Sequence, residues 1–153
     1  MSVNVGLALQ GDAELLRAFN ALDDKIQKKV TRKGFRAGGR ILLNASKAAA
    51  APISSRLAKS LKLRALKRRG KRGKGKLIGV VVITPKKEVL GIASDAKGYW
   101  PAHVEMGFKH RGGQHIPARS FLRRPAIRNE ARVFAATGQE IKRVIEEIWR
   151  TRR

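Results

Sequence analysis

The longest pattern in the amino-terminal part of the chain is a row of apolar residues at three- and four-residue steps, the spacing of one helix face. Its members are Leu15, Phe19, Leu22, Ile26 and Val30. The row weakens at Gly34 and Gly38-Gly39, then resumes in an alanine-rich stretch. Pro52 ends it, because a proline inside a helix loses a hydrogen bond and clashes with the preceding turn. We therefore expect one long helix, or two collinear helices, over about 13–51.

A second helical row closes the chain, and we expect Pro125 to start this helix because proline suits the first helical position. The apolar positions again step by three and four residues: Ile127, Ala131, Phe134, Gly138, Ile141, Ile145 and Ile148. The pattern predicts a long C-terminal helix with one apolar face.

Between the two helical rows the apolar pattern is typical of short strands. Residues 77–84 are apolar and largely β-branched, which predicts a buried strand, and 89–93 is expected to be the returning strand. Upstream, 57–66 is expected to form a short helical turn running into a strand. Alternating apolar residues predict one more short strand at 3–9.

A short helix and a loop complete the predicted order of elements. Pro101 is suited to the first position of a helix and Gly107 to its end, and 108–116 is expected to be a loop. The order strand, helix, strands, short helix, long helix predicts an α+β fold. We expect one domain over 1–153, with a small antiparallel sheet packed against the long N-terminal and C-terminal helices.

Net charge adds a functional constraint. Thirty-five Lys and Arg face eleven Asp and Glu, which gives +24. Self-repulsion at this level opposes compaction and is usually relieved by an anionic partner. A phosphate backbone and an acidic protein neighbour both fit, and the sequence leaves the two open. With 42% hydrophobic residues the chain can nevertheless build a core, unlike a disordered polycation.

The densest charge lies in residues 67–76, which consist of seven cations and three glycines. Glycine flexibility and charge repulsion predict a mobile basic hairpin loop. Its candidate contact residues for nucleic acid or an acidic partner are Lys67, Arg68, Arg69, Lys71, Arg72, Lys74 and Lys76. No aromatic residue is interleaved, so base stacking by this loop is not expected. The alternative is a solvated loop that binds nothing.

Residues for catalysis or metal binding are sparse. There is no cysteine, and His103 and Glu105 would point about 200° apart on a helix, too far to share an ion. His110 and His115 are expected to be loop and surface histidines. Adjacent acids such as Glu146-Glu147 have cations at helical spacing, which favours salt bridges. We expect no enzyme activity, metal or other cofactor, and no signal peptide or membrane span.

Two stretches carry a resemblance to a known family. Residues 99–107 (YWPAHVEMG) and 116–126 (IPARSFLRRPA) resemble the pattern Y-A-x-x-V-E-x-G-T … P-A-R-P-F-L-R-P-A of the bacteriophage neck and minor tail protein family. Residues 50–61 are similar to its A-P-x-x-T-G-x-L-x-x-S-I stretch. The chain departs from the pattern at Trp100-Pro101, and it has Ser55 for glycine, Phe108 for threonine and Ser120 for proline.

The resemblance implies a head–tail joining or tail-completion protein of a long-tailed phage. Such a protein forms a homo-oligomeric ring between head-connector and tail proteins, around the DNA channel, in a virion assembled in the host cytoplasm. The motif residues expected to serve structure and assembly are Pro52, Tyr99, Glu105, Gly107, Pro117, Phe121, Leu122 and Pro125. The alternative function is a free, sequence-nonspecific nucleic-acid-binding protein.

Four of these motif positions have expected roles that their residue types suggest. Gly107 is expected to end its helix in a left-handed conformation, and Phe121 and Leu122 to be apolar anchors. Glu105 lies amid cations, so we expect an ion pair with an arginine such as Arg119 or Arg123, buried or between subunits.

Overall fold

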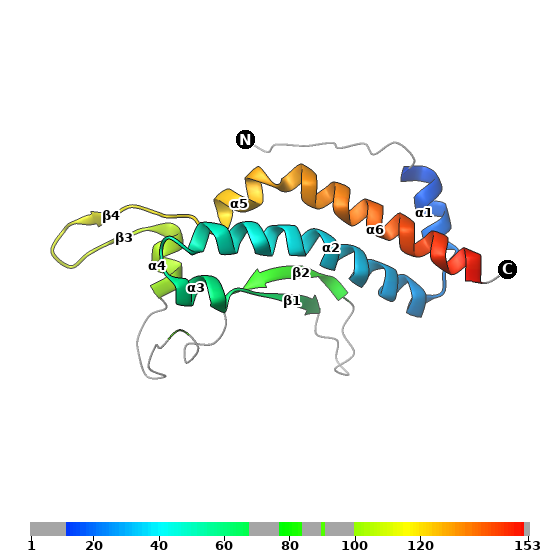
Figure 1. Cartoon of the computed structure of the whole chain (residues 1–153), viewed down its shortest axis with the longest axis horizontal. Helices are drawn as coiled ribbons and strands as arrows, with labels where there is room; N and C mark the ends of the chain where they lie inside the picture. Colours follow the sequence, from blue (N-terminus) through cyan, green and yellow to red (C-terminus); the bar gives the residue numbers. More distant parts are fainter. Residues whose placement is uncertain (1–11, 68–76, 84–89, 91–99, 152–153) are drawn as a thin grey trace.

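The computed structural model describes residues 12–67, 77–83, 90 and 100–151 of the chain. The elements are α1 (Asp12–Asn20), α2 (Asp24–Ala50), α3 (Ser55–Ser60), β1 (Lys62–Lys67), β2 (Leu77–Ile83), α4 (Trp100–Met106), β3 (Phe108–Lys109), β4 (His115–Ile116), α5 (Arg123–Arg128) and α6 (Glu130–Thr151). Helices α2 and α6 run side by side along the molecule, and β1 and β2 lie on the other side of α2 (Figure 1). The predicted α+β fold is confirmed.

The first predicted helix is broken at residues 21–23, and the expectation of collinear helices is wrong. α1 turns away from the axis of α2 at the N-terminal end of α2 and lies beside the C-terminal end of α6 (Figure 1). Asp23 leaves the helical conformation, with φ −56° and ψ 148°. The side-chain amide of Gln27 donates hydrogen bonds to the carbonyl oxygens of Phe19 (3.2 Å) and Leu22 (2.9 Å), which ties α2 to the turn.

Glycines bring α2 close to α6. Gly34 and Gly38 are one turn apart and buried. A Cβ on Gly34 would lie 2.5 Å from Cγ1 of Ile141, and one on Gly38 would overlap Oγ1 of Thr137. The weakening of the apolar pattern at these glycines therefore marks the line of closest helix contact, because a larger residue there would separate the helices.

The two-stranded sheet packs on a different side of α2. β1 and β2 pair antiparallel, with Leu63 opposite Val82 and Ala65 opposite Val80. A Cβ on Gly39 of α2 would lie 3.0 Å from Leu63, so this glycine is the contact point between helix and sheet. The helical turn before β1 and both strands of this hairpin confirm the sequence prediction. The strand expected at 3–9 lies outside the described residues, as does that at 89–93 apart from Leu90.

Two apolar clusters form the core. At the α1 end, the predicted helix face is confirmed, since Leu22 and Val30 are buried with Val144 and Ile145 of α6. At the opposite end the buried residues come from the end of α2, from α3 and from the loops: Ala50, Leu57, Leu61, Leu90 and Phe121. Helix α2 thus contributes to both clusters. The second cluster includes Phe121, one of the motif residues, and Leu122 packs against it.

The C-terminal part of the chain differs from the prediction in two ways. Pro125 does not start the last helix: it lies inside the short α5, and α6 begins at Glu130 after a break at Asn129. Asn129 has φ −110° and ψ 9°, and its side-chain amide donates to the carbonyl oxygen of Pro125 at 2.9 Å, which caps α5. The expected loop at 108–116 is instead a narrow hairpin, in which Phe108 pairs with Ile116.

Candidate assembly site

Glu105, near the end of α4, connects the two halves of the motif. Its carboxylate accepts hydrogen bonds from the backbone amides of Leu122 (Oε2, 2.9 Å) and Arg123 (Oε1, 2.9 Å). Leu122 is the N-cap residue of α5 and Arg123 is its first residue, and amides at the start of a helix have no partner within that helix. A carboxylate at this position satisfies both donors and neutralises the positive end of the helix dipole.

The expected ion pair between Glu105 and Arg119 or Arg123 within the chain is therefore wrong. Among the residues that the structure describes, no salt bridge includes Glu105. Its contact with Arg123 goes to the backbone amide and leaves the guanidinium exposed. An ion pair with a second subunit stays a prediction. The sequence missed the real contact because the partners are backbone groups 17 and 18 positions away.

Gly107 ends α4 in the left-handed conformation that was predicted, with φ +75°. Its amide donates to the carbonyl oxygen of His103 at 2.7 Å. A Cβ here would lie 2.7 Å from the carbonyl oxygen of Ile116 and 2.8 Å from the amide nitrogen of Ala118. Glycine is needed both for the turn and for the close passage of the returning strand of the hairpin.

The segment after β4 is also held to α4 by hydrogen bonds to backbone carbonyl oxygens of that helix. The amide of Arg119 donates to the carbonyl oxygen of Val104 at 2.8 Å, and Oγ of Ser120 donates to that of Glu105 at 3.2 Å. Ser120 has φ +25°. Proline, the residue of the family pattern at this position, holds φ near −65° and does not fit this turn. The backbone conformation at this position thus agrees with the presence of serine instead of proline.

The apolar motif residues anchor the start of α5 in the core. Phe121 is 1% exposed, and Leu122 packs against the same cluster, so both are the anchors that were predicted. Pro125 is buried. Pro52 and Pro117 are exposed: the first follows the C-terminal end of α2, and the second directly follows β4.

Several predicted contact residues are not placed. Tyr99 and residues 68–76 lie outside the described residues. Lys67 is the last residue of β1, where it pairs with Leu77 across an irregular step. The candidate contacts of the basic hairpin loop with nucleic acid or an acidic partner therefore stay predictions.

The structure exposes apolar residues that the sequence pattern assigns to a buried face. Ile127 is 63% exposed and Phe134 is 53% exposed, although both belong to the apolar row of the predicted C-terminal helix. Ile127 lies in α5, and the break at Asn129 separates it from the part of the row in α6. Phe134 lies in α6 itself, where Val133 and Thr137 make the close contact with Gly38 of α2. Asparagine is a preferred N-cap residue, and Asn129 before Glu130 was the signal for the break.

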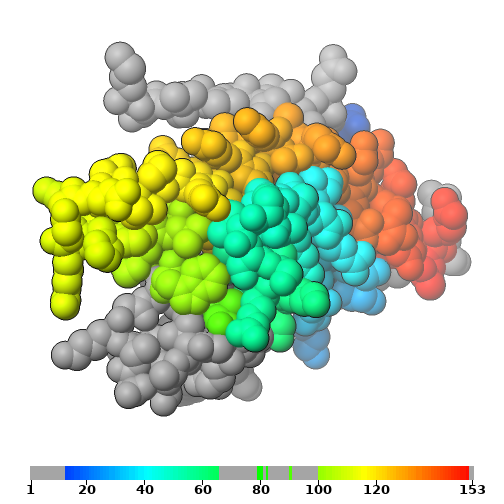
Figure 2. All heavy atoms as spheres, turned by 60° about the vertical axis from the view of Figure 1, so that its left-hand side comes forward, coloured from blue at the N-terminus to red at the C-terminus, as the bar shows by residue number. Residues whose placement is uncertain are grey.

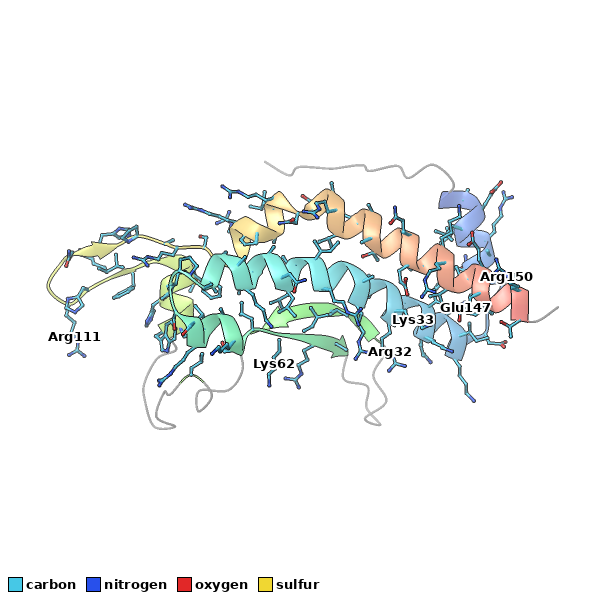
Figure 3. The ribbon with its side chains drawn as sticks, viewed as in Figure 1. Arg32, Lys33, Lys62, Arg111, Glu147 and Arg150 are labelled. Atoms are coloured by element: carbon cyan, nitrogen blue, oxygen red, sulfur yellow. The ribbon has the colours of Figure 1, made fainter. Side chains whose placement is uncertain are left out.

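Next to this apolar surface, the β3–β4 hairpin projects from the body. It extends past the ends of α2 and α5, and Arg111 lies near its tip (Figures 1 and 3). In the space-filling view the hairpin forms one edge of the molecule (Figure 2). At its base Met106 is 71% exposed, and the rings of His103 and Phe108 lie 5.2 Å apart.

Two of the histidines make contacts with neighbouring residues. His103 contacts Phe108, and Nδ1 of His110 accepts a hydrogen bond from the amide of Gly112 at 3.3 Å. Within the described part of the chain, no three His, Cys, Asp or Glu side chains group to hold a metal ion. No helix in that part is both long and apolar enough to cross a membrane.

Comparisons with protein-family models, with curated proteins and with solved structures found no match to this chain.

Proposed function

We propose that this protein is a structural component of the neck of a long-tailed phage, where copies form a ring that joins the head connector to the tail around the DNA channel. The observation that carries the proposal is the contact of the Glu105 carboxylate with the start of α5. The two stretches that resemble the neck family are separated in sequence, yet Glu105 in the first accepts hydrogen bonds from Leu122 and Arg123 in the second. If the two stretches of the family pattern together specify one local structure, their residues should contact each other, as Glu105 contacts Leu122 and Arg123.

The shape around this junction suits contact between subunits. Within the described residues the projecting hairpin pairs with no further strand, and Ile127 of α5 and Phe134 near the start of α6 are large exposed apolar residues. Arg124 and Arg128 are exposed on the same helix as Ile127. Interfaces commonly combine an apolar centre with a polar rim, and arginine is enriched in them. We assign this surface, made by the hairpin, α5 and the start of α6, to contacts with neighbouring proteins in the ring.

The net charge sets a condition on such an assembly. Copies that each carry +24 repel one another at low ionic strength. We expect the purified chain to be monomeric or weakly associated, and the ring to form with acidic neck or tail partners or at high salt.

The interface is tested in phage particles whose own copy of the gene is deleted and supplied in trans. We expect deletion to leave heads and tails unjoined, and the wild-type gene to restore joined particles. An Ile127→Glu, Phe134→Glu variant should fail to restore them. The matched control is Leu16→Glu, which alters another exposed apolar residue, 61% exposed, at the opposite end of the molecule and should restore joining. Normally joined particles from the deletion strain would refute the proposed function.

A further inference from the structure

The exposed side of α2 carries a continuous row of cations. Lys25, Lys29, Arg32, Arg36 and Arg40 are all exposed, and their steps of four, three, four and four residues place them on one helix face. We call these five residues the α2 basic stripe. With a rise of 1.5 Å per residue, it extends about 22 Å along the helix.

The positive charges of the stripe are not neutralised by salt bridges with described residues. The cations that do form ion pairs on α2 flank it: Lys28 lies 3.5 Å from Asp24, and Lys33 lies 3.9 Å from Glu147 of α6 (Figure 3). Across the described residues, no salt bridge includes a member of the stripe. The charge of Arg40 contributes to lowering the pKa of Glu140, although the two residues form no salt bridge.

We infer that the α2 basic stripe binds the phosphate backbone of double-stranded DNA without sequence preference. The alternative partner, an acidic protein surface, is less well matched because stable protein interfaces have an apolar centre. None of the large exposed apolar residues of the described chain lies on α2. The stripe consists of charged ends on flexible stems, which suffice for phosphate contacts but do not read base edges.

The kind of nucleic acid follows from the same surface. Binding of single strands relies on aromatic side chains that stack with bases. The aromatic residue of α2, Phe35, lies on a different side of the helix from the stripe and is partly buried. The steps along the stripe are about 4.5 to 6 Å, short enough for neighbouring cations to reach successive phosphates of a duplex.

This inference goes beyond the neck ring and does not depend on it. A neck protein with such a stripe would hold the DNA in the channel, and a free protein would bind duplex in the same way. The stripe is also complete without residues 68–76.

The test is the affinity of the purified full chain for a mixed-sequence duplex of about 30 base pairs, measured over a range of salt concentrations. In the stripe variant, Lys25, Lys29, Arg32 and Arg36 are changed to Gln, and Arg40 is kept. In the control variant, four exposed cations near the hairpin and α5 are changed to Gln: Lys109, Arg111, Arg124 and Arg128. Both variants lose four charges, so a general effect of net charge acts on both alike.

We expect the slope of log affinity against log salt to become shallower by roughly 3 to 4 in the stripe variant, at about 0.9 per lost phosphate contact. The control variant should keep most of the wild-type slope. Equal changes in both variants, or an unchanged slope in the stripe variant, would overturn the inference. Poly-glutamate serves as a model of an acidic protein surface. If the stripe variant lost binding to poly-glutamate but bound DNA like the wild type, the inference would be overturned in favour of an acidic protein partner.

A charge-preserving variant separates charge from folding. Lys25→Arg, Lys29→Arg, Arg32→Lys and Arg36→Lys together should retain the wild-type slope, because phosphate contacts of this kind depend on charge. A loss equal to that in the Gln variant would contradict the inference. Since the assay uses only the purified chain and DNA, its failure leaves the neck proposal standing, and failure to find the protein in the neck leaves this one standing.

Discussion

The carboxylate of Glu105 lies 2.9 Å from the backbone amide nitrogen of Arg123 and thereby ties the end of α4 to the start of α5. A second bond, to the amide of Leu122, makes the contact bidentate. Hydrogen bonds to an ionised acceptor are stronger than neutral ones, and the helix dipole adds to them. The motif glutamate is thus explained by the local structure before any subunit contact is invoked.

Glu105→Ala should lower the free energy of unfolding by about 1 to 2 kcal/mol, the range for loss of a helix cap. Glu105→Gln keeps one acceptor oxygen and should cost less. Chemical denaturation measures both. Glu146→Gln is the control, because it removes an exposed glutamate of α6. Equal stability of the Ala variant and the wild type would show that the two bonds contribute nothing.

Gly38→Ala tests the close contact between α2 and α6. Alanine favours the helix by about 1 kcal/mol, but its Cβ would overlap Oγ1 of Thr137 and lie 2.8 Å from the carbonyl oxygen of Val133. Overpacking of this kind costs about 1 to 3 kcal/mol, so we expect net destabilisation in thermal or chemical unfolding. Gly112→Ala, whose Cβ would have 3.6 Å to its nearest neighbour, should be nearly neutral. A more stable Gly38→Ala protein would rule out the close contact.

Two buried serines should respond in opposite directions to replacement by alanine. Ser46 in α2 is fully buried, and its Oγ has no hydrogen-bond partner among the described residues. Ser60 is equally buried, but its Oγ donates to the carbonyl oxygen of Leu57 at 2.6 Å. Ser46→Ala removes an unsatisfied group and should stabilise by roughly 1 kcal/mol, whereas Ser60→Ala should destabilise by a similar amount. Chemical denaturation of the pair decides, and destabilisation by Ser46→Ala would mean that its hydroxyl has a partner.

Arg143 should make stability depend on pH through Glu140. Its guanidinium donates two hydrogen bonds to the Glu140 carboxylate, at 2.9 and 2.8 Å, which lower the pKa of that group from its ordinary value of 4.5. A lowered folded-state pKa stabilises the protein above the ordinary value, and the contribution is lost as pH falls through the folded-state pKa. The stability difference between wild type and Arg143→Gln should therefore shrink below pH 4.5.

NMR titration of the carboxyl carbon is the direct measurement for this pair. We expect the pKa of Glu140 to rise in Arg143→Gln and to change little in the control Lys142→Gln, which removes the neighbouring exposed charge. An unchanged pKa of Glu140 in Arg143→Gln would contradict the assignment.

The sequence predicted the parts of the fold that depend on periodic burial. The face through Leu22 and Val30, the strands at β1 and β2, and the left-handed Gly107 were all readable, because each follows from local pattern or residue type. The break after α1 was hidden because Leu22 keeps the apolar row in step through the turn.

The candidate site was readable only in part. Gly107 and Phe121 have the roles that their residue types suggested. The partners of Glu105 are backbone amides brought close by the tertiary fold, and residue types alone do not reveal such contacts. Phe134 is exposed although it belongs to the apolar row, because the close contact of α6 with α2 runs through Val133 and Thr137, which apolar spacing does not reveal.

The most direct test of the neck proposal is the location of the protein in phage particles. Virions made from the genome that encodes this chain would be labelled with gold-conjugated antibodies raised against it and imaged by electron microscopy. We expect label at the junction of head and tail, and no label elsewhere on the head or along the tail. Virions that lack the protein, or that carry it elsewhere than at the junction, would contradict the proposal.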